Sequence, residues 1–271
     1  MMRHAQLRFS GRKVQRPCRM LYRSVATLED ILLGRECALC GDPLFKHRTR
    51  RSQVCRVCTA GLYSASLAGA ASRCSICGRP LLREQGICTS CRKLEQAPPF
   101  DSHFAALEYR DGGEELIAAF KMRRNRAVVR LAASLLLQRT SDLDRTPETP
   151  VGFPVSDEYV CVPVPPGSRS ARRRDFQPVD LLVREVARMK RLPVKRLLAR
   201  VGRGLDQKKL GREERSKNVA GNFVYCEEPP VPTVVLLIDD VYTTGATVSE
   251  CAKVLKEAGV QHVYVRTIAM D

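Results

Sequence analysis

Eight cysteines between Cys37 and Cys91 form four Cys-x-x-Cys pairs, and this duplicated pattern constrains the fold more than any other feature. CALCGDPL (37–44) and CSICGRPL (74–81) share the frame C-x-x-C-G-x-P-L, and a second pair, CRVC or CTSC, follows each. Two such pairs supply the four thiolates of a closed, tetrahedral zinc site, so we expect about two structural zinc ions. The predicted ligand sets are Cys37, Cys40, Cys55 and Cys58 in one site, and Cys74, Cys77, Cys88 and Cys91 in the other.

The repeat favours this sequential pairing of the cysteines but leaves an interleaved arrangement open. No secretory signal is visible in the basic N-terminal segment, which favours metal in a reducing compartment over a disulfide framework. No apolar run approaches the ~20 residues of a membrane span. We therefore expect a cytoplasmic protein without a membrane span. The remaining cysteines, expected to be ordinary core or surface residues, are Cys18, Cys161, Cys226 and Cys251.

Apolar segments after the Pro98-Pro99 linker alternate between strand and helix character, which predicts an α/β fold with a largely parallel sheet and helices on both faces. The expected domains are a basic arm (1–33), a double zinc ribbon (34–97) and the α/β domain (98–271). The expected strands are 103–110, 159–166, 194–201, 222–226, 234–239 and 262–270, and the expected helices lie within 112–139, 176–191 and 248–259.

The segment VVLLIDDVYTTGAT (234–247) combines a buried strand, two acids and a loop of small and hydroxylated residues. Ligands of open α/β sheets bind beyond the carboxyl ends of the strands, where Asp239 and Asp240 are expected. Adjacent carboxylates there favour a ribose diol, which donates hydrogen bonds, or a hydrated magnesium ion. The following loop and helix N-terminus form an anion site. The predicted phosphate-binding residues are Thr243, Thr244, Gly245, Ala246 and Thr247.

This string resembles the 5-phosphoribosyl-1-diphosphate (PRPP) signature of type I phosphoribosyltransferases, and the chain from about residue 28 onward resembles the ComF family. LIAAFKMRR, VPVPP and the zinc-ribbon module are similar to family features. The segment 206–223 matches a family frame through Gln207, Leu210, Glu214, Arg215, Asn218, Gly221 and Phe223. One segment departs from the family: RRRDFQP (172–178) stands where R-G-F-N-Q is usual, and keeps Arg174 and Phe176.

The resemblance implies a type I phosphoribosyltransferase-like fold that binds PRPP or ribose 5-phosphate with magnesium, with Arg169 as a candidate on the diphosphate side. It also implies a role in natural transformation, with single-stranded DNA and a competence helicase or other DNA-processing proteins as partners. Two alternatives stay open: an enzyme that transfers phosphoribosyl from PRPP to a nitrogen nucleophile, and a non-catalytic zinc-ribbon adaptor. No catalytic residue is apparent.

The formal net charge of +17 favours polyanionic partners, nucleic acid first. The absence of tryptophan argues against an aromatic base-stacking platform. A solvated basic surface is the alternative for every basic run. The candidate nucleic-acid contacts are Lys121, Arg123, Arg124, Arg126, Arg172, Arg173 and Arg174, together with Arg48, Arg50 and Arg51 in the first ribbon loop.

Overall fold

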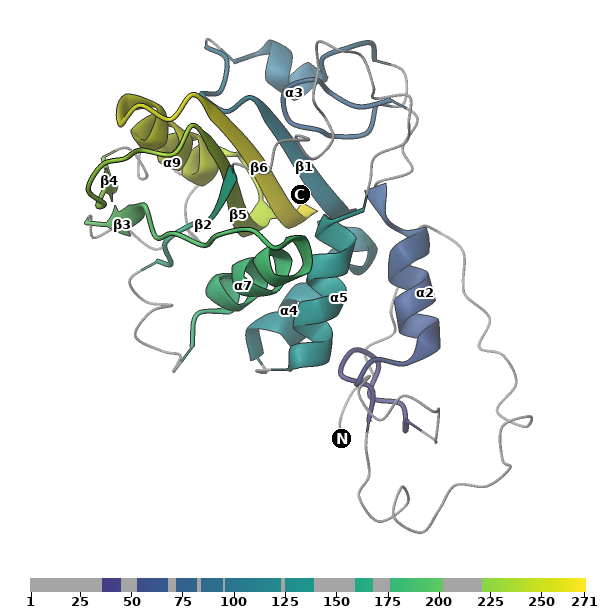
Figure 1. The fold of residues 1–271 in the computed structure, drawn as a ribbon. Coiled ribbons are helices and arrows are strands. Elements are labelled where there is room, and N and C mark those ends of the chain that lie inside the picture. Colours follow the sequence, from purple (N-terminus) through teal and green to yellow (C-terminus); the bar gives the residue numbers. More distant parts are fainter. Residues whose placement is uncertain are drawn as a thin grey trace.

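The computed structural model describes the two cysteine-rich segments and most of the α/β domain (Figure 1). The described residues are 36–44, 53–67, 72–81, 84–94, 96–122, 125–138, 159–167, 176–201 and 221–271. Among these residues, no helix combines the length and apolar character that a membrane crossing requires.

A four-stranded, wholly parallel sheet forms the centre of the α/β domain, with strand order β1-β6-β5-β2. Its strands are nearly continuous apolar runs, as expected where a parallel sheet is covered on both faces. The α/β fold with a mostly parallel sheet is therefore confirmed, whereas its phosphoribosyltransferase-like character stays a prediction. The strands are β1 (Ser102–Glu108), β2 (Tyr159–Pro163), β5 (Val234–Tyr242) and β6 (His262–Met270).

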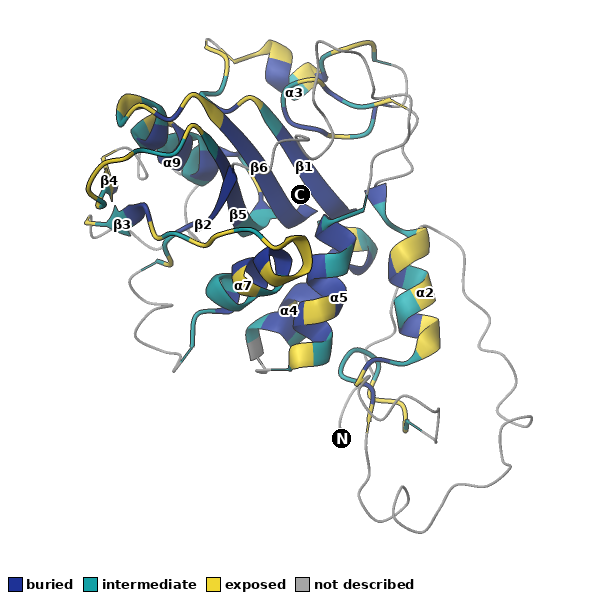
Figure 2. Ribbon diagram, viewed as in Figure 1, coloured by how far each residue is buried: buried dark blue, intermediate teal, exposed yellow. Residues whose placement is uncertain are grey.

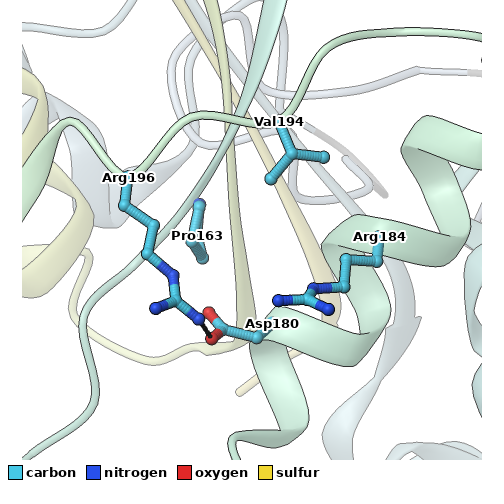
Figure 3. A pocket seen from close by; sticks show the side chains of 5 residues that line it. All are labelled: Pro163, Asp180, Arg184, Val194 and Arg196. Carbon is cyan, nitrogen blue, oxygen red and sulfur yellow. Dashed lines mark hydrogen bonds and ion pairs between the residues drawn. The ribbon is translucent and has the colours of Figure 1, made fainter.

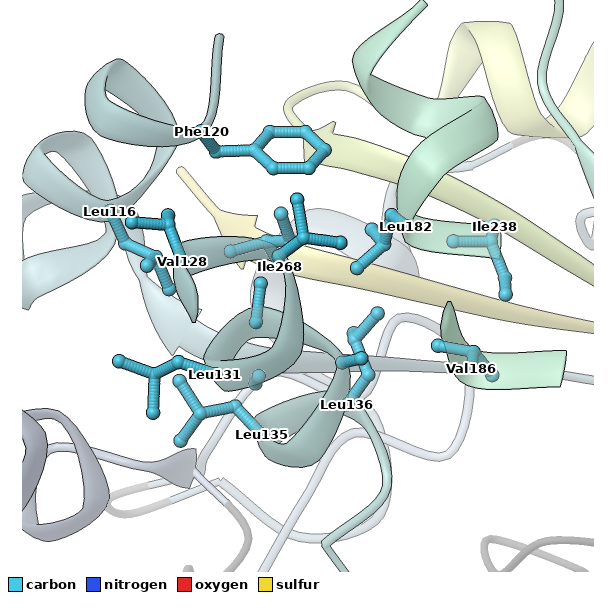
Figure 4. Close-up of a cluster of buried hydrophobic side chains, with 14 of the residues drawn as sticks. Leu116, Phe120, Val128, Leu131, Leu135, Leu136, Leu182, Val186, Ile238 and Ile268 are labelled. Atoms are coloured by element: carbon cyan, nitrogen blue, oxygen red, sulfur yellow. The ribbon is translucent and has the colours of Figure 1, made fainter. Parts of the chain in front are cut away.

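Helices cover both faces of this sheet (Figure 2). Three of them pack on one face: α4 (Glu114–Met122), α5 (Arg126–Leu136) and α7 (Pro178–Lys190). The other face carries α9 (Ala246–Glu257). Figure 4 shows the core on the three-helix side, where apolar side chains of the helices meet Ile238 and Ile268 of the sheet.

The helical pattern predicted within 112–139 forms two helices instead of one. The side-chain oxygen of Asn125 accepts hydrogen bonds from the backbone N–H groups of Ala127 and Val128, which makes it the N-cap of α5. Before α4, the segment η2 (Tyr109–Gly113) is a kinked turn and not a regular helix, because Asp111 and Gly112 have non-helical backbone angles, with Gly112 at φ +86°. Asn125 thus starts a new helix where the apolar spacing alone gave no break.

The strands predicted at 194–201 and 222–226 exist, but of these residues only Val194 pairs with the parallel sheet, through an isolated parallel bridge to Cys161 of β2. They form the antiparallel pair β3 (Leu198–Arg200) and β4 (Phe223–Tyr225). Their buried side chains, which include Leu198 and Phe223, belong to the core on the α9 side. This pair therefore extends that core beyond the edge of the main sheet.

The two cysteine-rich segments belong to the cores on opposite sides of the sheet. The first contains α2 (Arg56–Ser64), which lies beside α5 (Figure 1). The Tyr63 hydroxyl of α2 lies 2.7 Å from the Ser134 hydroxyl of α5. The second contains α3 (Thr89–Arg92), and its four cysteines belong to the core on the α9 side. Both segments thus share a core with the sheet, although the predicted domain boundary at 97/98 stays a prediction.

Candidate functional site

The eight cysteines gather into two four-sulfur clusters, and in each cluster the sulfur atoms lie within 4.8 Å of one another. The Sγ–Sγ distances are 3.8 Å between Cys40 and Cys55 and 3.7 Å between Cys77 and Cys88. A tetrahedron with Zn–S bonds of about 2.3 Å has edges of about 3.8 Å, so the donors fit zinc. Each cluster contains one knuckle and the pair that follows it, which confirms the sequential grouping and excludes the interleaved one.

The duplicated frame folds into two nearly identical knuckles. The backbone N–H of Cys37 donates to the backbone oxygen of Asp42, and that of Cys74 to the backbone oxygen of Arg79; each N–O distance is 2.8 Å. The glycine after the second cysteine of each frame has a positive φ, which few other residues adopt without strain. In addition, backbone N–H groups donate to sulfur within both clusters, an arrangement that favours thiolates. The local sequence therefore builds closed sites suited to a structural metal.

The acid pair Asp239–Asp240 lies inside β5 and not at its end, which corrects the expected position. The strand continues to Tyr242 because β6 extends alongside it and pairs Val241 with Ala269. Successive residues of a strand point to opposite faces, so the two carboxylates diverge.

Each carboxylate therefore has its own surroundings. Asp240 faces α4, where its Oδ2 lies 2.5 Å from the Lys121 ammonium. Asp239 lies near the α9 side, where its charge contributes to the raised pKa of the buried Cys251 thiol. Burial, and then the charge of Asp240, raise the pKa of Asp239 to about 8. The hydrogen bond from the Asp240 N–H and the charge of Lys121 lower this pKa, but their effect is smaller. The Asp239 carboxyl is therefore largely protonated at neutral pH.

The loop after β5 leads directly into α9. Gly245 is the N-cap of this helix, at φ +79°, and Ala246 and Thr247 form its first turn. The Thr244 hydroxyl accepts a hydrogen bond from the Ala246 N–H, at an N–O distance of 3.3 Å. The N–H groups of Thr247 and Val248 have no acceptor among the residues that the structure describes. These orphan donors, beside a shallow hollow of about 20 Å³ between Val241 and Val248, are the groups that bind an anion at a helix N-terminus.

Two aromatic residues that sequence reasoning missed lie beneath this loop. His103 of β1 stacks on Tyr242, with ring centroids 4.1 Å apart and an interplanar angle of 22°. Burial lowers the pKa of His103 to about 3, so its ring is neutral. Tyr242 was part of the recognised string, but only the long-range packing of β1 brings His103 to it. No local pattern in the sequence could have indicated this pair.

The other predicted site residues divide into two groups. Lys121 is engaged with Asp240, and its predicted contact with nucleic acid stays a prediction. Arg126 opens α5 as its first residue. The rest lie outside the described residues: Arg48, Arg50, Arg51, Arg123, Arg124, Arg169, Arg172, Arg173 and Arg174.

A separate cavity of about 300 Å³ lies between α7 and the segment before β3 (Figure 3). It is lined by Pro163, Asp180, Arg184, Val194 and Arg196, none of which was predicted as a site residue. Asp180 forms an ion pair with Arg196, while Arg184 approaches from the other side. The cavity therefore has one positive charge in excess and lies apart from the cysteine clusters.

Comparison with known proteins shows which families this chain resembles. Residues 28–92 match the double zinc ribbon domain, which covers both cysteine clusters. Competence protein F of Haemophilus influenzae is 29% identical over 200 residues, which cover 72% of this chain and 83% of that protein. The chain is a homologue of competence protein F.

Two further relatives of this chain extend the comparison. The DNA utilization protein YhgH of Salmonella typhi is 29% identical over 205 residues, covering 71% of this chain and 87% of that protein. Competence protein ComFC of Bacillus subtilis is 22% identical over 192 residues, covering 69% of this chain and 72% of that protein. The resemblance to the ComF family noted in the sequence is thus confirmed.

Proposed function

We propose that this ComF homologue binds PRPP or ribose 5-phosphate at the end of β5 and handles single-stranded DNA during DNA uptake. One observation supports the ligand most: the first turn of α9 presents two backbone N–H groups without a described acceptor, next to Gly245 in a left-handed conformation. Such donors, aligned with the helix dipole, favour a phosphate group. The names of the relatives, competence protein F and DNA utilization protein, support the role in DNA uptake.

The acid pair gives this site the acceptors that a ribose needs. Asp240 would accept from one ribose hydroxyl, and the same contact would release the Lys121 ammonium toward the diphosphate. Ionisation of Asp239, favoured by magnesium or by the second ribose hydroxyl, would supply the other acceptor. PRPP therefore supplies hydrogen-bond donors for Asp240 and, once it is ionised, for Asp239. Arg169 remains the proposed contact on the diphosphate side.

Calorimetric titration with PRPP and magnesium tests the ligand, with two glycine variants as a matched pair. Gly245 and Gly259 flank α9, and both have a positive φ, so alanine strains the backbone at both positions. Only Gly245 belongs to the proposed phosphate loop, and a Cβ added there would lie 2.3 Å from the Tyr242 hydroxyl oxygen, whereas a Cβ added to Gly259 would meet no atom of the described residues within 4 Å. The added Cβ must displace the loop or Tyr242, and if this breaks one charge-assisted hydrogen bond to the phosphate it costs about 1.5–3 kcal/mol, so Gly245→Ala is expected to weaken binding at least about tenfold. Gly259→Ala is expected to bind as the wild type does.

Equal PRPP affinities of the two glycine variants would show that the phosphate does not bind at this loop. The double variant Asp239→Asn with Asp240→Asn tests the ribose contacts in the same titration, with an expected loss of at least about tenfold. Release of diphosphate that requires an added nitrogen nucleophile, which takes the phosphoribosyl group, would assign turnover to the site and favour the phosphoribosyltransferase alternative.

Single-strand binding is tested by the salt dependence of affinity for an oligonucleotide. Each phosphate contact adds about 0.7 to the slope of log affinity against log salt. Replacing Arg172, Arg173 and Arg174 by alanine is therefore expected to flatten the slope by about 2. The control removes the same charge from α7 and its C-cap, through Arg184→Ala, Arg188→Ala and Arg191→Ala. A slope that changes equally in both triple variants would mean that only overall charge matters.

A further inference from the structure

The second knuckle (74–81) lies directly against the sheet, in contrast to the equivalent turn of the first knuckle. A Cβ added to Gly78 would lie 2.2 Å from the backbone oxygen of His103, whereas a Cβ added to Gly41 would meet no atom within 4 Å. The two glycines have nearly the same φ, +69° and +72°. The two turns thus differ in what they contact and not in their own conformation.

His103 connects this knuckle to the interior of the sheet. Its Nδ1 lies 2.7 Å from the backbone oxygen of Cys77, and its Nε2 lies 2.9 Å from the Thr267 hydroxyl of β6. Because a carbonyl oxygen only accepts, Nδ1 is the donor, and Nε2 accepts from Thr267. The imidazole plane is therefore fixed at one end by a residue of the second cysteine cluster.

Tyr242 continues the connection from His103 to the loop. The His103 ring stacks on it, and a Cβ added to Gly245 would lie 2.3 Å from the Tyr242 hydroxyl oxygen. A second route runs in parallel. The Arg79 guanidinium donates to the backbone oxygen of Asp271, at an N–O distance of 2.5 Å. The Asp271 N–H in turn donates to the backbone oxygen of Tyr242, at 3.0 Å. Two sets of contacts thus lead from the knuckle to the residue beneath Gly245.

We propose that the second cysteine cluster, acting through His103 and Tyr242, holds the 243–247 loop in its ligand-binding conformation. His103 and Tyr242 are then positioning residues, and the metal in this cluster is coupled to the loop. Reciprocity requires that ribose-phosphate binding strengthens retention of this metal by the same factor. The inference rests on the proposed ligand for its affinity readout only, because the conformation of the loop can be followed without ligand.

The first cluster serves as the internal control. Among the described residues, its segment contacts α5 through Tyr63 and Ser134 and belongs to the core on the opposite face of the sheet. Metal at Cys37, Cys40, Cys55 and Cys58 is therefore not expected to influence the loop.

Gly78→Ala and Gly41→Ala form the matched pair for the experiment, because both variants keep all eight cysteine ligands. Hydrogen–deuterium exchange of peptides covering 242–249 is measured without ligand, followed by the affinity for PRPP and the zinc content. Gly78→Ala is expected to speed exchange in these peptides and to weaken PRPP binding about tenfold, a typical coupling between sites. Gly41→Ala is expected to leave both quantities at the wild-type values.

Equal loop exchange in the two variants, with zinc retained, would overturn the coupling whether or not PRPP binds. Faster exchange in Gly78→Ala alone, in a protein that does not bind PRPP, would sustain the coupling and reject the proposed ligand. If Gly78→Ala fails to fold, Tyr242→Leu and Tyr242→Phe replace it. Only Tyr242→Phe keeps the stacked ring, so equal exchange in these two variants would also overturn the coupling.

Discussion

Asp239→Asn tests the electrostatics of the site through the pH dependence of folding. The folded carboxyl has a pKa of about 8, whereas the reference value for an exposed Asp is 3.8. Between these values the unfolded chain has lost this proton and the folded chain retains it. The free energy of unfolding therefore falls as pH rises, and the loss is complete above pH 8. Asparagine cannot titrate, and its side-chain oxygen can still accept from the Asp240 N–H.

The magnitude follows from the width of the pH window. Each pH unit between the two pKa values costs about 1.4 kcal/mol, so the bound from pH 6 to pH 8 is about 2.7 kcal/mol. Asp239 shares its interactions with Asp240 and Lys121, and we expect about 1–2 kcal/mol of this bound to be observed. The stability of Asp239→Asn relative to wild type is thus expected to rise by that amount between pH 6 and pH 8.

Urea unfolding at pH 6, 7 and 8 in the presence of zinc measures this quantity. Titration of the cysteine clusters cancels, because each variant is compared with wild type at the same pH. Asp240→Asn is the control: it removes the smaller cause of the shift but leaves Asp239 buried, so most of the slope is expected to persist. Parallel stability profiles for wild type and Asp239→Asn would refute the assignment of a raised pKa to this carboxyl.

Three further measurements test other parts of the structure. Elemental analysis is expected to find about two zinc ions per chain, falling to one in Cys40→Ser and in Cys77→Ser; an unchanged content would reject the ligand sets. Lys121→Gln is expected to leave the salt slope of single-strand binding unchanged, because Asp240 holds the ammonium; a decrease of about 0.7 would assign Lys121 to DNA. Asn125→Ala is expected to lower the free energy of unfolding by about 1 kcal/mol in urea titrations, whereas Asn125→Asp retains the cap and the stability.

Features with a local cause were predictable from the sequence. The cysteine clusters follow from the spacing of thiols along one short segment, and the parallel sheet follows from apolar runs such as 234–238. Even the grouping of the cysteines, which the sequence left open, is consistent with the repeat that favoured it. In these cases the residues that determine the structure are neighbours in the chain.

Features that depend on distant partners were not predictable. The length of β5 depends on its pairing with β6, which places Asp239 inside the strand and turns Asp240 toward Lys121 of α4. The stack of His103 on Tyr242 joins residues 139 positions apart in the chain. Apolar spacing predicted helix on both sides of Asn125, but the break depends on a single side chain that caps α5.

The position of β6 has a consequence for the order of events during synthesis. β6 is the last strand of the sheet in chain order, yet it lies between β1 and β5 and pairs with both. During translation, β1 therefore has no neighbouring strand to pair with until β6 is made, and more than half of the chain is translated in between. The cysteine segments precede β1 and depend on metal for much of their folding energy, so they can acquire structure first. Zinc supply during translation would then set whether the second cysteine segment already contacts the nascent β1 when β6 arrives.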